Sequence, residues 1–507
     1  KGDLKTIEKI CRLVMTKCND DLSIQYKTSA LNTIVRFQGL EAMGSVFQAA
    51  ASPNDKYRNA AIMMTLEIPG KEVVQKWLAF FPKASPDAKP EIITMLGLRG
   101  DQAALPLVSK SLTDQNFNVR KEAAEAVVKL GGDETVNSLI NYMVLFSSTS
   151  DQEAAKSALM TVAGSDMMPL LIPVLKEGDP AARKTVIELL AWSRENQYFP
   201  EVLPFTSSTD EPLRTAAFKA LASLAGPDDQ DKLIELLAAA ENPEYVAGIQ
   251  AAIAAAAGKI PDPERRSAKL LQAISGKVKK EKIIPVLAQT GGHEALAVVL
   301  KEFENGSSDI RDVCFKSLIN WVDYSASSAL YEICASGNKT FEAPAFDGYL
   351  RQISSSDLPD EQKLLLYRKI MPYAKDTDRK IKILDEAGDL KIYQSLFFVS
   401  KFLDDPALSS AAAMAVISVA LPSGGTGMSG DLVKEILIKT SGQLKGSESD
   451  YYKEMINKYI TTMPAGEGFK PVFNGRDLTG WHGLVENPVV RATLKPDELA
   501  KKQAEAD

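Results

Sequence analysis

The chain has 507 residues, of which 45% are hydrophobic and 25% charged, and its formal net charge is −7. No apolar run is long enough to cross a bilayer, and an acidic chain does not suit a phosphate backbone, so we expect neither a membrane span nor a nucleic-acid partner. One hydrophobic core rarely serves so long a chain, which leaves several domains or an elongated repeat array.

The chain contains two histidines and four cysteines, and their spacing does not match that of a metal site. We therefore expect no metal and no cofactor. The four cysteines are expected as buried thiols. Cys314 and Cys334 could also meet between adjacent helices, so their disulfide state stays open.

Residues 1–50 are expected to cap a regular pattern that begins near residue 54. In that pattern a basic or polar side chain recurs every 31 residues, with one interval of 32. The positions are Arg58, Lys89, Arg120, Gln152, Arg183, Arg214 and Tyr245. A fixed period of this length is typical of a repeat protein, so seven phased segments are predicted.

Each segment predicts two helices. Asp179-Pro180 and Asn242-Pro243 combine a capping side chain with a proline suited to the first helical turn, and Gly100 is one of several glycines that end these stretches. Between them lie second helices with apolar residues at three-and-four spacing. Prolines inside several of these helices should bend them. These prolines are Pro106, Pro173 and Pro204.

Two further features of the segments have a packing role. Ala123 and Ala124 are examples of small residues placed where neighbouring helices approach closely. Asp179 and Arg183 are four residues apart, so their charges can pair along one helix face, or the arginine can extend to the loop of the next repeat. We prefer a structural ladder of arginines to a ligand site, because a repeated position usually serves the repeat.

Paired helices with these arginines, alanines and terminal glycines resemble the HEAT and HEAT-like repeat family. The resemblance is clear from about residue 54 to 258 and looser to 403, with a possible extension to 463. It implies an all-α fold, an α-α superhelix over residues 1–463, with a protein partner on the concave face of the solenoid. An irregular all-α bundle is the alternative.

The pattern is interrupted later in the chain. The basic run Lys277–Lys282 is expected to be a solvated helix start, with a phosphate or acidic partner as the alternative. Residues 337–360 are predicted to be an irregular insertion or loop. Its aromatic residues Phe341, Phe346 and Tyr349 are candidate binding residues, although such inserts often pack over the solenoid. A glycine-rich stretch, 421–430, is predicted to be a linker.

Composition changes at residues 464–468, where we place a domain boundary. An alternating strand pattern over 469–473 and the turn pair Asn474-Gly475 follow. The segment from Phe473 to Trp481 closely resembles the opening of the 3-keto-disaccharide hydrolase family, a concanavalin-like β-sandwich. The pair Asn487-Pro488 and a helix over 496–500 resemble an early insert in that family.

This second resemblance covers about the last forty residues, which are too few to close a sandwich. It implies the beginning of a carbohydrate-active domain over 464–507, with most of the catalytic domain beyond Asp507 and no catalytic site here. Trp481 is a candidate binding residue, and a glycan-derived molecule is a candidate ligand. The sequence therefore predicts a scaffold that carries or positions such a domain. The alternative is a subunit of an enzyme that hydrolyses 3-keto glycosides. The family suggests an exported protein, periplasmic or at the cell surface.

Overall fold

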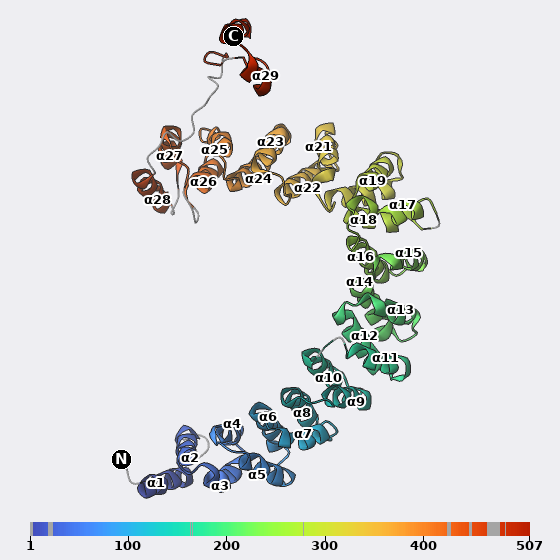
Figure 1. The fold of residues 1–507 in the computed structure, drawn as a ribbon, viewed down its shortest axis with the longest axis vertical. Helices are drawn as coiled ribbons and strands as arrows, with labels where there is room; N and C mark the ends of the chain where they lie inside the picture. Colours follow the sequence, from blue (N-terminus) through green and yellow to red (C-terminus); the bar gives the residue numbers. More distant parts are fainter. Residues whose placement is uncertain are drawn as a thin grey trace. The chain divides into compact units, whose positions relative to one another are not determined.

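The computed structural model describes residues 4–18, 24–162, 164, 166–276, 278–422, 427–445, 449–463, 477–481 and 483–506. The chain divides into two compact units, unit 1 over residues 1–295 and unit 2 over residues 296–507. Throughout the described ranges the regular elements are α-helices and short 3-10 turns, without a strand. The all-α fold class predicted from the sequence is confirmed (Figure 1).

The helices up to residue 290 are α1 (Leu4–Lys17), α2 (Ile24–Gln38), α3 (Met43–Ala50), α4 (Asp55–Met64), α5 (Glu72–Phe80), α6 (Ala88–Arg99), α7 (Leu105–Ser111), α8 (Phe117–Leu130), α9 (Thr135–Leu145), α10 (Thr149–Val162), α11 (Met168–Glu177), α12 (Pro180–Ser193), α13 (Phe199–Val202), α14 (Glu211–Leu224), α15 (Gln230–Ala239), α16 (Pro243–Gly258), α17 (Ala268–Ala273) and α18 (Lys280–Thr290).

The remaining helices are α19 (His293–Asn305), α20 (Ser308–Ile319), α21 (Ser327–Ser336), α22 (Glu342–Ser354), α23 (Asp360–Ile370), α24 (Thr377–Asp389), α25 (Tyr393–Ser400), α26 (Ser409–Ala420), α27 (Asp431–Gln443), α28 (Ser449–Thr462), α29 (Pro488–Thr493) and α30 (Pro496–Ala506).

In unit 1 the helices alternate between two rows. Each even-numbered helix from α4 to α16 packs on the next even-numbered helix, and an odd-numbered helix pairs with each from the other side, as in α7 with α8 and α11 with α12 (Figure 1). Unit 2 repeats the pairing in α21 with α22 and α25 with α26. Each repeat is therefore a helix pair whose second member stacks along the array, as the sequence predicts.

The predicted caps position these helices. The Asp179 carboxylate accepts a hydrogen bond from the backbone N–H of Ala182 at 2.8 Å at the start of α12, and Asn242 accepts one from Glu244 at 2.9 Å at the start of α16. Gly100 ends α6 with a φ of 71°, a left-handed conformation that glycine adopts without steric cost. Local side-chain chemistry thus sets where each helix begins and ends.

Small residues let the stacked helices approach closely, as predicted. Ala123 and Ala124 in α8 are buried. Gly97 in α6 lies directly against α8, since a Cβ placed on it would be 2.7 Å from the Cβ of Ala126. In unit 2 a Cβ on Gly388 of α24 would be 3.1 Å from the Cα of Ala415 in α26. The backbone separation between repeats is therefore set by side-chain size.

Some predicted elements are wrong. Residues 337–360 are not an irregular insertion, because α22 occupies 342–354 and pairs with α21. Gly348, which suggested a loop, lies in the helix interior where a Cβ would be 3.1 Å from Ile319, so close packing explains this glycine. Among the prolines expected to bend helices, Pro173 does lie inside α11, whereas Pro106 and Pro204 stand in the first turns of their elements.

The C-terminal part is described only in pieces. The predicted boundary at 464–468, the strand at 469–473 and the turn at 474–475 lie outside the described residues, and the part of 477–506 that the structure describes contains no strand. Asp477 accepts a hydrogen bond from the N–H of Thr479 at 3.0 Å, which makes it a turn residue. The predicted helix over 496–500 is present as the start of α30.

All four cysteines are free thiols, which answers the question of a disulfide between Cys314 and Cys334. Three of them are buried, and Cys18 is half-buried. None of the described helices combines the length and the hydropathy that spanning a bilayer requires.

Candidate protein-interaction surface

A ladder of arginines joins successive repeats of unit 1. In α4, α8, α12 and α14 the fourth residue is an arginine that donates a hydrogen bond to a backbone carbonyl shortly before its own helix, in the preceding loop or, for Arg183, in the last turn of α11. The four pairs are Arg58 with Ser52 at 3.1 Å, Arg120 with Asp114 at 2.8 Å, Arg183 with Lys176 at 2.6 Å and Arg214 with Ser208 at 2.7 Å.

Three of these arginines also bind the next even-numbered helix. Arg58 donates to Glu91 at 2.9 Å and Arg120 to Asp151 at 2.8 Å, each through two nitrogens, while Arg214 donates to the Tyr245 hydroxyl at 2.9 Å. The predicted structural ladder is confirmed at these three arginines, whereas Arg183 makes no such contact with the next helix. The predicted role of the aspartate is different, because the Asp179 carboxylate caps its own helix and does not accept a hydrogen bond from a ladder arginine.

The Arg120–Asp151 pair is the centre of a buried polar network. The Asp151 carboxylate also accepts hydrogen bonds from Tyr142 at 2.7 Å and Ser148 at 2.6 Å. Burial raises the pKa of the Asp151 carboxyl, but the hydrogen bonds from Arg120, Ser148 and Tyr142 outweigh it and hold this pKa below its usual value. The guanidinium also lies 4.0 Å from the ring centre of Phe146. Every acceptor position is in use, so the network has a structural role.

The arginine ladder is interrupted between α10 and α14. At the phased position of α10, Gln152 replaces arginine and donates to the carbonyls of Met143 and Phe146 at 2.7 and 2.8 Å, and Thr185 of α12 donates to its amide oxygen at 2.5 Å. In α12, the Nε of Arg183 is buried without a hydrogen-bond partner. No side-chain hydrogen bond or ion pair connects residues 180–193 to residues 211–224, both of which are fully described, so α12 and α14 meet through apolar packing.

A second ladder lies at the opposite ends of the even-numbered helices. Arg99 donates to the carbonyls of Thr65, Ile68 and Gly70 in the preceding repeat at 2.8, 2.7 and 2.6 Å. Lys259 donates to the Ala225 carbonyl at 2.8 Å in the same manner. A cation stabilises these carbonyls because the last turn of a helix carries unpaired acceptors and the negative end of its dipole.

Sequence reasoning missed this second ladder. The sequence signal for this ladder is a basic residue in or just after the last turn of the second helix of a repeat. It stands about one repeat length after the carbonyls that it binds. In unit 2, Arg351 makes the equivalent contact with the Ile319 carbonyl, 32 residues earlier. Both ladders therefore hold the α4–α6 and α14–α16 interfaces, one at each end of the helices.

The outer charges of the even-numbered helices pair with one another, within a helix and in one case across repeats. Lys156 in α10 forms ion pairs with Glu153 at 2.8 Å and with Glu188 in α12 at 2.7 Å, and Lys184 also pairs with Glu188 at 3.0 Å. Lys121 in α8 pairs with Glu122 at 3.3 Å. Since these charges neutralise one another, this row of helices presents a mixed and largely balanced surface.

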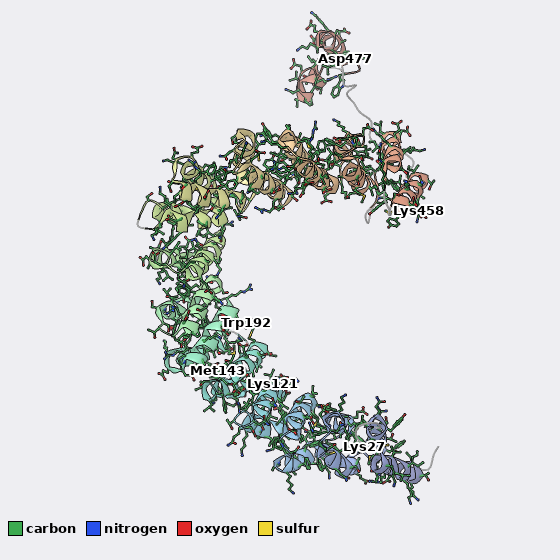
Figure 2. The ribbon with its side chains drawn as sticks, turned by 180° about the vertical axis from the view of Figure 1, so that it is seen from behind. Lys27, Lys121, Met143, Trp192, Lys458 and Asp477 are labelled. Carbon is green, nitrogen blue, oxygen red and sulfur yellow. The ribbon has the colours of Figure 1, made fainter. Side chains whose placement is uncertain are left out.

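Three apolar side chains are exposed at the C-terminal ends of these helices. Trp192, the penultimate residue of α12, is 45% exposed, and Figure 2 labels it on the same row of helices as Lys121. Leu66 and Leu98 are 37% and 51% exposed, and they line an open groove of about 700 Å³ together with Arg99. An exposed tryptophan on a rigid surface is the residue type most enriched in protein-binding hot spots.

The predicted binding residues have different environments. Phe346 and Tyr349 are buried in α22, and the Tyr349 hydroxyl donates to the Leu366 carbonyl at 3.1 Å. Phe341 is half-buried and packs against Phe315, with ring centres 4.5 Å apart. Trp481 is 49% exposed in the turn at 477–481. Burial of Phe346 and Tyr349 makes these two rings part of the packing and leaves them no face for a partner.

The basic run Lys277–Lys282 is partly structural. The Lys282 ammonium is buried and donates to the carbonyls of Leu237 and Ala240, and it lies 3.3 Å from Glu241. Lys279 forms an ion pair with Glu241 at 3.4 Å, and Lys277 lies outside the described residues. These two lysines connect α18 to the end of α15, so the predicted solvated helix start is wrong for Lys282. Among the described residues, no three His, Cys, Asp or Glu side chains are arranged to hold a metal ion.

Comparison with known proteins bears on the repeat. A family model described as HEAT repeats matches residues 74–161 and 168–254. No curated protein matches the chain. A solved structure of Kap121p bound to Nup53p is similar to this chain, with 14% sequence identity and a TM-score of 0.47. The match covers 90% of this chain and 53% of Kap121p, so this chain spans about half the length of that protein. Human deoxyhypusine hydroxylase in complex with glycerol is similar with 16% identity and a TM-score of 0.22, covering 50% of this chain and 97% of that protein. The repeats predicted from the sequence are therefore HEAT repeats over the matched residues, and the chain has the fold of a HEAT-like helical solenoid.

Proposed function

We propose that this chain is a protein-interaction scaffold, and that its partner binds the even-numbered helices of unit 1, which we assign as the concave face predicted from the sequence. The single observation that carries the proposal is the exposed Trp192 on a row of helices that is otherwise charge-balanced. Stacked helix pairs form extended surfaces of this kind, and the ladders fix the interfaces that they span before a partner arrives.

The energetics favour binding centred on apolar anchors. Glu188, one turn before Trp192, is already paired with Lys156 and Lys184, so a further surface ion pair to it would contribute little. A large aromatic side chain that is buried on binding contributes more, about 1.5–3 kcal/mol from the area removed from water. Leu66 and Leu98 offer a second anchor point where the groove between their repeats is open.

Trp192→Ser tests this proposal. The matched control is Leu145→Ser, because Leu145 is 61% exposed and lies on the odd-numbered helix α9. Proteins crosslinked to the wild-type chain and to each variant in cells of the source organism would be quantified by mass spectrometry. The partner would then be purified and its affinity measured. We expect at least about ten-fold weaker binding for the Trp192 variant and unchanged binding for the control. Equal losses, or no loss, would refute this assignment of the binding face.

We also propose that the solenoid carries or positions a carbohydrate-active domain, with an enzyme subunit acting on 3-keto glycosides as the alternative, and that the protein is exported. What supports this is the resemblance of residues 473–481 to the hydrolase family, together with the helix at 496–506. Turnover of a 3-keto glucoside by the native protein, compared with the chain ending at residue 463, tests the domain. Equal turnover by both would place the activity elsewhere, and no turnover by either would remove the enzymatic alternative.

A further inference from the structure

The end of helix α12 differs from the ends of the second helices before it. Gly100 follows α6 and Gly131 follows α8, 31 residues later, and both have a φ of 71°. The next position in this phase is Ala163, after the interval of 32, and it lies outside the described residues. The position after that is Arg194, which has a φ of 58°. An arginine therefore stands where earlier repeats have glycine.

This backbone conformation is unfavourable for an arginine. At a positive φ the Cβ comes too close to the following carbonyl oxygen, and glycine avoids this cost because it has no Cβ. Among the described residues other than glycine, only Arg194 and Glu486 have a positive φ. Local folding energy would favour glycine at position 194, which points to a use of the arginine side chain other than ending the helix.

The Arg194 side chain is not used in the packing of the repeats. Basic residues at this end of the second helices bind carbonyls of the preceding repeat, as Arg99 and Lys259 do. Arg194 is exposed, and its guanidinium makes no hydrogen bond or ion pair with a residue that the structure describes. A cation that only stabilised the helix dipole could stand within the last turn, as Arg99 does, where it needs no positive φ.

Arg194 follows the exposed Trp192 by two positions at the end of the same helix. Tryptophan and arginine are among the residue types most enriched in the hot spots of protein interfaces. On the same row of helices, Lys156 and Lys184 are already paired with Glu188. The face around Trp192 therefore combines a large aromatic side chain with a guanidinium that is available to a partner.

We propose that Arg194 is a recognition residue of this face, and that the partner segment carries a carboxylate next to the apolar side chain that covers Trp192. This inference rests on the function proposed for the Trp192 face and names the chemistry of its partner. A guanidinium presents parallel N–H donors that match the two oxygens of a carboxylate, and such a charge-assisted contact is strong and directional. The partner is an acidic segment of another protein, with an aromatic or aliphatic residue beside an aspartate or glutamate.

Other occupants fit this face less well. Nucleic acid needs several available cations along one surface, whereas Lys156 and Lys184 are held by Glu153 and Glu188. A phosphate group carries more negative charge than a carboxylate, so the adjacent Glu195 would repel it more strongly. A second copy that used the same face about a two-fold axis would bring the two Arg194 cations towards each other.

The test selects peptides on the chain of residues 1–507. A library of short random peptides is first depleted on the Trp192→Ser variant and then enriched on the wild-type chain, so that the retained peptides depend on Trp192. We expect these peptides to share an aromatic or aliphatic residue beside aspartate or glutamate. Selection on Arg194→Asn should lose the acidic preference, and asparagine is a residue that tolerates a positive φ.

The affinity of one selected peptide isolates the contact. Fluorescence anisotropy should show about ten-fold weaker binding for Arg194→Asn, and a similar loss when the peptide carboxylate is replaced by an amide. The two changes together should cost little more than either alone, because they remove the same contact. Arg368→Asn is the matched control, since Arg368 is exposed on the odd-numbered helix α23, and it should bind as the wild type does.

Arg194→Gly separates recognition from folding. This variant restores the glycine of the earlier repeats, so its melting temperature should rise by about 1–3 °C. Its binding to the peptide should nevertheless weaken as much as that of Arg194→Asn. A side chain with a structural role would give the opposite change in stability, and a lower melting temperature would therefore contradict the proposal.

The outcomes distinguish this inference from the function on which it rests. If no retained peptide depends on Trp192, both the face and the role of Arg194 are refuted. Peptides that depend on Trp192 but show no acidic preference, and that Arg194→Asn binds equally well, would refute the role of Arg194 alone. Self-association in sedimentation that Arg194→Asn abolishes would make the occupant a second copy of the chain.

Discussion

The carboxylate of Asp151 lies 2.8 Å from the Nε of Arg120, which stands 31 residues earlier, so this ion pair spans one full repeat. The side chains are only 3% and 8% exposed. The contact therefore joins two repeats from the inside, where water contributes little screening.

Removal of Arg120 from this ion pair should strongly destabilise the folded chain. We expect Arg120→Ala to lower the free energy of unfolding by about 3–5 kcal/mol, because the Asp151 carboxylate would remain buried without its cation. Urea unfolding followed by circular dichroism would measure this change. Lys121→Ala, at the neighbouring and 47% exposed position, should cost less than about 1 kcal/mol. Similar losses in the two variants would contradict a special role for the buried pair.

The same carboxylate predicts how stability depends on pH. Its folded-state pKa lies below the ordinary value of 3.8, so its stabilising contribution is complete above about pH 4 and is lost as the pH falls through the folded-state pKa. We expect the difference in melting temperature between wild type and Asp151→Asn to be largest near neutral pH and to shrink in acid. Melting curves between pH 3 and pH 7 would show this. A difference that is constant over that range would argue against the ionised pair.

Helix separation can be tested at Gly97. Gly97→Val places side-chain atoms where Ala126 of α8 already lies within 3 Å, so we expect a loss of about 1–3 kcal/mol from overpacking. Gly44→Ala is the contrasting variant, because α3 has open space at that position and alanine favours the helix by about 1 kcal/mol. Thermal unfolding of both variants gives the comparison. Tolerance of valine at Gly97 would mean that α6 and α8 separate easily.

The second ladder predicts a local effect. Arg99→Ala should leave the carbonyls of Thr65, Ile68 and Gly70 without their cation, and we expect a loss of about 1–2 kcal/mol. Hydrogen exchange should rise over residues 65–70 before it rises elsewhere in unit 1. Arg99→Lys should restore part of the protection. Exchange that rises uniformly along the unit would indicate global destabilisation instead.

Thiol reactivity should separate the cysteines. Burial and the nearby Glu342 carboxylate raise the pKa of the Cys334 thiol to about 11, so it carries almost no thiolate at pH 8. Cys18 is half-buried and more accessible. Alkylation followed by mass spectrometry should therefore label Cys18 well before Cys334, and denaturant should remove the difference. Equal rates in the folded protein would contradict the burial of Cys334.

The repeat and its ladder were predictable because their causes are local or periodic. Asp179 caps its helix through a neighbouring N–H, and the 31-residue spacing of the arginines follows from the stacking of equal units. The helix α22 was not predicted, because Gly348 looks like a loop residue unless the position of Ile319 is known. Burial of Phe346 depends likewise on helices distant in sequence. The exposure of Trp192 has no sequence signature, since an aromatic residue at helical spacing is usually part of the core.

The seam between α12 and α14 has a mechanical consequence. A bidentate ion pair such as Arg120 with Asp151 fixes both a distance and an angle, whereas apolar contact has no preferred direction. Two helices held by apolar contact alone can pivot slightly at little energetic cost. Thermal bending of unit 1 should therefore concentrate between residues 193 and 211, two repeats beyond the joint made by Arg120 and Asp151, and a ligand bound to both α12 and α14 would have to restrain that motion.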